Sequence, residues 1–150
     1  MKDITHAYLV KRAARWLCNS NGCLWVLTER GGMEMPDAIG FKRYDGESIL
    51  VECKTTLSDF YADKRKAWRM LPTIGMGRWR WYLTPPGLLD GRELPEGWGW
   101  LECCKNCLRK RVEAAPFPSN IIGERREIGL LIHNWANSID YKEFELGDGI

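Results

Sequence analysis

Two apolar stretches, MPDAIGF (residues 35–41) and SILVECK (residues 48–54), decide the fold of this chain. Between them lies Arg43-Tyr44-Asp45-Gly46, whose Asp-Gly pair is a strong signal for a tight turn between two strands. Both stretches have the length and the apolar character of short strands. The sequence therefore predicts a β-hairpin over residues 35–54.

This hairpin is expected to gather three charged side chains. Asp37 and Glu52 are equally far from the centre of the turn, so they are predicted to be cross-strand neighbours. Because side chains alternate along a strand, Lys54 falls on the same face as Glu52, whereas Cys53 points to the other face. Two carboxylates and one amine are therefore expected to converge.

Such a set of side chains is typical of a site for a divalent cation. Two facing carboxylates repel each other in a poorly solvated site unless a cation separates them, and oxygen ligands favour Mg²⁺ or Mn²⁺. The ion polarises a phosphodiester and activates water, while Lys54 would hold that water or stabilise developing negative charge. The backbone carbonyl of Cys53 would complete the metal shell. The alternative is a surface salt bridge between Lys54 and either acid, without function.

Hydrophobic periodicity predicts the elements around the hairpin. It indicates helices over residues 4–17, 57–71 and 120–139, the second of them capped by Ser58 and closed by Pro72. Short strands are expected at residues 24–28, 78–83, 97–103 and 108–112, and the 78–83 strand would carry its arginines on one face and its tryptophans on the other. Together these elements predict an α/β fold in which helices flank a mixed central sheet.

The motif and its surroundings resemble the PD-(D/E)xK nuclease superfamily, whose members cleave DNA or RNA with Mg²⁺. Pro36-Asp37 and Glu52-x-Lys54 match the core motif, and LVECKTTLSDFYADKRK (residues 50–66) is similar to small bacterial and prophage members related to the MmcB DNA-repair group. The resemblance implies a restriction-endonuclease-like fold, with Asp37 and Glu52 as metal ligands and Lys54 as the catalytic lysine. It also suggests Glu29 as a further acid of the site, in competition with Glu34.

Basic residues are concentrated in the middle of the chain. Between Lys42 and Arg80 there are nine Lys and Arg against five Asp and Glu, so a phosphate backbone is expected to follow this surface. The candidates for nucleic-acid contact are Lys64, Arg65, Lys66, Arg69, Arg78 and Arg80. A merely solvated helix face explains residues 64–66 equally well.

Length and composition indicate one domain, residues 1–139, followed by an acidic tail, residues 140–150. The chain has 150 residues, of which 45% are apolar, enough for a single core, and its net charge of +2 is too small to indicate nucleic acid by itself. No apolar run has the length of a signal peptide or a membrane span. We therefore expect a cytoplasmic protein with no membrane partner.

The six cysteines are expected to be reduced in that compartment. Cys103, Cys104 and Cys107 lack the second ligand pair of a structural zinc site, so ordinary thiols are favoured over a zinc-stabilised adaptor. His6 and His133 stand alone on their helices and are expected to be packing or surface residues.

The resulting prediction is a metal-dependent endonuclease or exonuclease with Mg²⁺ or Mn²⁺ as its cofactor, and the resemblance alone favours DNA as its substrate. The alternative is a non-cleaving phage or prophage regulator that retains the nuclease fold and binds nucleic acid or protein. A Leu, Ile and Trp stripe on the C-terminal helix would then form a homodimer or bind a partner protein.

Overall fold

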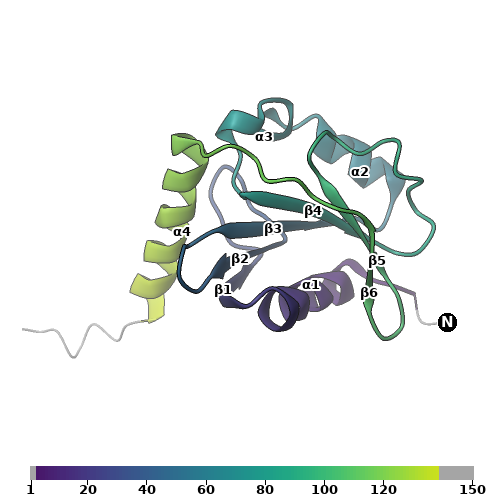
Figure 1. The fold of residues 1–150 in the computed structure, drawn as a ribbon, viewed down its shortest axis with the longest axis horizontal. Helices are drawn as coiled ribbons and strands as arrows, with labels where there is room; N and C mark the ends of the chain where they lie inside the picture. The colour runs from purple at the N-terminus through teal and green to yellow at the C-terminus, as the bar shows by residue number, and fades with distance from the viewer. Residues whose placement is uncertain (1–2, 139–150) are drawn as a thin grey trace, which may run out of the picture.

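In the computed structural model, residues 3–138 are described, and they form one six-stranded sheet with helices on both faces (Figure 1). The strands are β1 (Cys23–Thr28), β2 (Ala38–Lys42), β3 (Ser48–Cys53), β4 (Trp79–Thr84), β5 (Gly99–Cys103) and β6 (Leu108–Val112). They lie side by side in sequence order. Strands β3, β4 and β5 run parallel, and the outer pairs are antiparallel. The predicted α/β fold with a mixed sheet is confirmed.

The hairpin formed by β2 and β3 has the predicted register. Ala38 pairs with Val51, as expected for a turn centred between residues 44 and 45. The Oδ1 atom of Asp45 accepts a 2.9 Å hydrogen bond from the N–H of Glu47, and Gly46 has a φ of +67°, which favours glycine. Continued by one residue, this register brings Asp37, which precedes β2, opposite residue 52 of β3.

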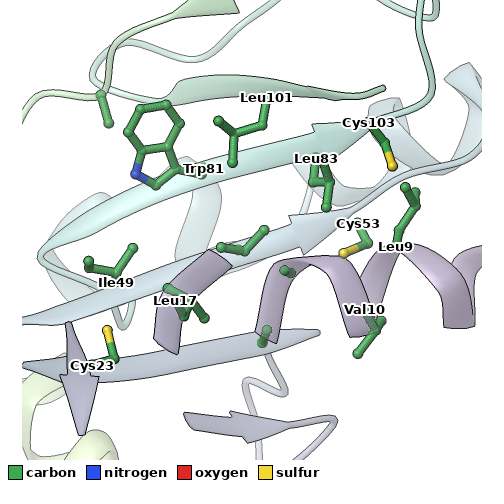
Figure 2. Packing of buried hydrophobic residues seen from close by; sticks show 14 residues of the cluster. Leu9, Val10, Leu17, Cys23, Ile49, Cys53, Trp81, Leu83, Leu101 and Cys103 are labelled. Carbon is green, nitrogen blue, oxygen red and sulfur yellow. The ribbon is translucent and has the colours of Figure 1, made fainter. Parts of the chain in front are cut away.

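One face of the sheet is covered by helix α1 (His6–Ser20), which begins where the hydroxyl of Thr5 accepts a hydrogen bond from the N–H of Tyr8. Figure 2 shows the apolar side of α1 packed on the sheet, with Leu9, Val10 and Leu17 over Ile49, Cys53, Trp81, Leu83 and Leu101. Cys53 therefore points into this core. By strand alternation, residue 52 must face the opposite side of the sheet.

The opposite face is covered by α2 (Leu57–Lys64), the short helix α3 (Ala67–Met70) and part of α4 (Ile121–Ser138). A 3-10 turn, η1 (Pro72–Ile74), links α3 to β4. Figure 1 shows α2 and α3 above the sheet, whereas α4 stands at its side. The second core lies between these elements and consists of Leu27, Ile39, Phe41, Leu50, Phe60, Met76, Tyr82, Leu89, Trp98 and Trp100.

The prediction of a single helix over residues 57–71 is wrong, because this segment forms two helices, α2 and α3. Arg65 ends α2, and Lys66 is extended with a ψ of 144°. The N-cap is Thr56 rather than Ser58, and its hydroxyl accepts a hydrogen bond from the N–H of Asp59. The break turns the second half of the segment toward the sheet, where Arg69 meets buried carboxylates.

The remaining predicted strands and helices agree with the structure to within a few residues. Within residues 3–138, no helix combines the length and the apolar character needed to cross a membrane. Residue 139 and the predicted acidic tail, residues 140–150, lie outside the described residues.

Candidate active site

The three motif side chains meet at the carboxyl end of β3. Glu52 and Lys54 have side chains that are 3% and 10% exposed, and Lys54 Nζ lies 3.3 Å from Glu52 Oε2. The Oδ2 atom of Asp37 accepts a 2.7 Å hydrogen bond from the N–H of Cys53, which fixes this carboxylate beside the end of β3. The structure thus brings together the residues that the hairpin geometry predicted.

Arg69 is the main correction to the predicted site. The sequence made it a surface contact for nucleic acid, but its side chain is only 1% exposed. Its guanidinium lies 2.9 Å from an oxygen of each of three acids: Glu34, Glu52 and Asp63. A buried guanidinium is stable only with such compensation, so Arg69 holds the site together from inside.

Asp63 is a member of the site that the sequence analysis missed. Its Oδ1 atom lies 3.5 Å from Lys54 Nζ, and its Oδ2 atom accepts a 2.7 Å hydrogen bond from the hydroxyl of Tyr82. Burial alone would raise the pKa of Asp63, but Arg69 and Lys54 outweigh it and hold the pKa at about 2. Asp63 is therefore charged at neutral pH and anchors both cations.

Glu52 is the carboxylate with the least favourable surroundings. Burial, which is the largest effect, together with Asp37 and Asp63 raises its pKa to about 7, although Arg69 and Lys54 act in the opposite direction. Burial also disfavours the charge of Lys54, but the acids Glu52 and Asp63 outweigh it and raise the pKa of Lys54 above its usual value. The raised pKa of Glu52 therefore reflects its burial, since two cations, Arg69 and Lys54, already lie beside it.

A second group of ligating atoms faces Asp37 from the solvent side. The Nε2 atom of His6 lies 3.4 Å from Asp37 Oδ1 and 3.5 Å from Glu29 Oε1. Ligand atoms of these three residues all lie within 4.8 Å of one another. Glu29 also has a φ of +50°, an uncommon conformation for a residue with a Cβ atom, of a kind that concentrates at functional sites.

The position of His6 differs from the sequence-based interpretation, in which this residue stands alone. No local signal predicts its neighbours, because it starts α1 while Glu29 follows β1 and Asp37 precedes β2. These three positions become adjacent only when the helix packs on the sheet. His6 and Glu29 are 44% and 58% exposed and are therefore accessible to an ion from solvent.

Glu29 and Glu34 both adjoin the site, on different sides. Glu34 is buried: one of its oxygens pairs with Arg69 and the other accepts a 2.8 Å hydrogen bond from the N–H of Met76. Glu34 therefore supports Arg69, whereas the exposed Glu29 is the acid that can serve a ligand beside Asp37.

The charges of the site fit a divalent cation. Four carboxylates adjoin two buried cations there, and the two further cations at the rim are partly exposed: Lys66, 3.0 Å from Asp63, and Arg126, 4.0 Å from Glu34. On the solvent side, Asp37 and Glu29 form no ion pair with a lysine or arginine of residues 3–138, so a doubly charged ion there would offset their negative charge. Its ligands would be Asp37 with Glu52 and the Cys53 carbonyl, or Asp37 with His6 and Glu29.

The other residues predicted to contact nucleic acid differ in how far their side chains are exposed. The prediction that Arg80 contacts nucleic acid is wrong. Its side chain is fully buried and donates hydrogen bonds to backbone carbonyls of the 72–77 segment. Lys64 and Arg78 are partly buried and each donates to one backbone carbonyl, at 2.6 Å in both cases. Arg65 and Lys66 are exposed and could contact a nucleic acid. The predicted basic surface is thus smaller than the sequence suggested.

Cys103 and Cys107 lie in different environments. Cys103 is buried under α1, as Figure 2 shows, while Cys107 is exposed and Cys104 is intermediate. Within residues 3–138, the converging group of metal-ligating side chains described above contains no cysteine.

Comparison with known proteins supports the fold alone. No family model matches the chain, and no curated protein is similar to it. Among solved structures, SPO1766, a protein of unknown function from Silicibacter pomeroyi, superimposes with a TM-score of 0.68 at 18% sequence identity. The match covers 100% of this chain and 99% of that chain, so the two proteins share a fold.

Proposed function

We propose that this protein is a metal-dependent nuclease that hydrolyses phosphodiester bonds, with DNA favoured over RNA. The observation that carries the proposal is the convergence of Asp37, Glu52 and Lys54 at the end of β3, where the side chains of Glu52 and Lys54 are buried. The resemblance of these residues and their spacing to the PD-(D/E)xK superfamily supports the substrate class and the preference for DNA.

Each side chain has a distinct task in the proposed reaction. A bound Mg²⁺ or Mn²⁺ would supply Lewis-acid activation of the phosphodiester and a water molecule of lowered pKa. Asp37 and Glu52 would hold the ion, with the Cys53 carbonyl as a further ligand. Lys54, kept charged by the acids beside it, would orient the attacking water or stabilise negative charge on the phosphate. Arg69 is a positioning residue, since it acts through Glu52.

The proposal is tested by incubating the protein with single-stranded, nicked, branched and duplex DNA, and with RNA, in Mg²⁺ or Mn²⁺. We expect Asp37→Asn to abolish cleavage and Lys54→Met to slow it by about 100-fold, the usual effect of losing one charge-stabilising contact. The matched control is Lys110→Met, because Lys110 is an ion-paired lysine, 50% exposed, on the edge strand β6 away from the site. Absence of cleavage by the wild type on every substrate, or cleavage that survives both active-site substitutions, would refute the proposal.

One contact favours a second candidate function, a non-cleaving regulator that keeps the nuclease fold. Arg69 and Lys54 already engage both oxygens of Glu52, at 2.9 Å and 3.3 Å, so this carboxylate is satisfied by protein groups. Calorimetric titration with Mn²⁺ separates the two functions. Binding heat that disappears in Asp37→Asn and Glu52→Gln supports the nuclease, whereas a wild type that binds no metal supports the regulator.

A further inference from the structure

A cleft of about 490 Å³ opens beside the candidate active site and shares Glu29 and Arg126 with its rim. One wall is formed by the segment that follows β1, including Glu29 and Arg30, and the other by one flank of α4, including Arg126 and His133. Its volume is that of a ligand site, and its lining combines two arginines, Arg30 and Arg126, with polar and small residues.

The charges of the lining select an anion. Arg30 is exposed and makes no ion pair with any of the residues 3–138. Arg126 is 25% exposed, and its Nη1 atom donates a 2.9 Å hydrogen bond to the carbonyl of Ile74, which holds the guanidinium at the edge of the cleft. The acid in the lining is Glu29, which belongs to the group around Asp37. Away from Glu29 the charged side chains of the cleft are therefore two arginines, of which Arg126 also lies 4.0 Å from the buried Glu34.

The cleft leads directly to the proposed reaction centre. Glu29 lines the cleft, and its carboxylate lies 3.5 Å from the ring of His6, which in turn lies 3.4 Å from Asp37. A chain of phosphates that lies between Arg30 and Arg126 would thus pass the metal-ligating side chains at one end of the cleft.

We propose that this cleft binds the sugar-phosphate backbone of the substrate strand next to the bond that is cleaved, with Arg30 and Arg126 as the phosphate contacts. The inference rests on the proposed function for its substrate class. It moves the path of the substrate strand away from the contacts predicted on α2, α3 and β4, of which Arg69 and Arg80 are buried, to the surface between β1 and α4.

The test measures binding rather than cleavage, by fluorescence anisotropy of a labelled single-stranded oligonucleotide in EDTA. Arg30→Ala removes a phosphate contact, and Gly129→Leu fills the cleft, because a Cβ atom at Gly129 meets nothing within 4 Å. We expect each variant to weaken binding at least fivefold and Arg30→Ala to lower the salt dependence by about one phosphate contact. Arg125→Ala, an exposed α4 arginine outside the cleft, is the control and should bind like the wild type.

The outcomes separate this inference from the proposed function. Oligonucleotide binding that is weakened by both cleft variants supports the cleft even if no metal-dependent cleavage is ever seen. Cleavage by a wild type whose cleft variants bind unchanged retains the nuclease and refutes the cleft. Loss of binding in Arg125→Ala equal to that in Arg30→Ala, or a wild type that binds no oligonucleotide, also refutes the cleft.

Discussion

Replacing Glu52 by Gln is predicted to remove a large pH dependence from the stability of the fold. The pKa of Glu52 is raised to about 7 in the folded protein, mainly by burial, against an ordinary value of 4.5 in the unfolded chain. Between these values the folded state binds a proton that the unfolded state has lost. The contribution of Glu52 to stability is therefore complete below pH 4.5 and is lost as the pH rises toward about 7.

The size of the effect follows from the same two pKa values. The difference between 4.5 and about 7 corresponds to about 3 kcal/mol of unfolding free energy, lost as the pH rises. Asp63 does not obscure this change, because its pKa is lowered to about 2 and its own contribution is lost only as the pH falls below about 4. Lys54 stays charged throughout, since its pKa is raised above its usual value.

The assay is urea unfolding of the wild type and of Glu52→Gln in EDTA, from about pH 4 to pH 8. The free energy of the wild type minus that of the variant should fall by about 3 kcal/mol across this range, and saturating Mn²⁺ should reverse the fall for the wild type alone. A difference that stays constant with pH would show that Glu52 titrates normally. Burial would then not determine the protonation of Glu52.

Two further predictions concern the interior of the site and the exposed side of α4. Arg69→Met should destabilise the fold by about 3–5 kcal/mol in urea unfolding, because it leaves buried carboxylates without compensation, whereas Arg65→Met, on the surface, should change little. The α4 residues Ile121, Ile128 and Trp135 are 63%, 55% and 57% exposed and lie seven positions apart. They form an apolar stripe that is symmetric about Ile128. Such a stripe suits antiparallel pairing with the α4 helix of a second copy. Light scattering should detect a dimer that Ile128→Glu dissociates, and a monomeric wild type at about 100 µM would contradict this pairing.

The hairpin could be predicted from sequence because every determinant of it is local. The Asp-Gly turn sets the register, and strand alternation then decides which side chains share a face. Asp37, Glu52 and Lys54 follow from these two rules alone. The same reasoning fails for His6 and Glu29, because their proximity to Asp37 arises from the packing of α1 on the sheet, which no short-range pattern encodes.

Arg69 shows why a charged helix face is a weak indicator of a binding surface. Its spacing from Arg65 and Lys66, four and three residues earlier, fits an exposed stripe of a helix, and only the break after Arg65 turns it inward. The sequence offers no apolar signal for that break, because what stabilises it is electrostatic. Three acids lie 2.9 Å from the guanidinium: Glu34 before β2, Glu52 on β3 and Asp63 on α2. The fold buries these carboxylates together, and they are stable there only with a cation between them.

The same arrangement links Arg69 to the chemistry of the motif. Because Arg69 fixes one oxygen of Glu52 at 2.9 Å, the other oxygen is oriented toward Lys54 before any ligand binds. A metal ion that uses Glu52 then meets a carboxylate whose rotamer is already set, which lowers the cost of ordering the site. An arginine that stabilised the fold alone would leave metal affinity unchanged when replaced. A positioning arginine must weaken Mn²⁺ binding in Arg69→Lys, which keeps the charge but not the three-way contact.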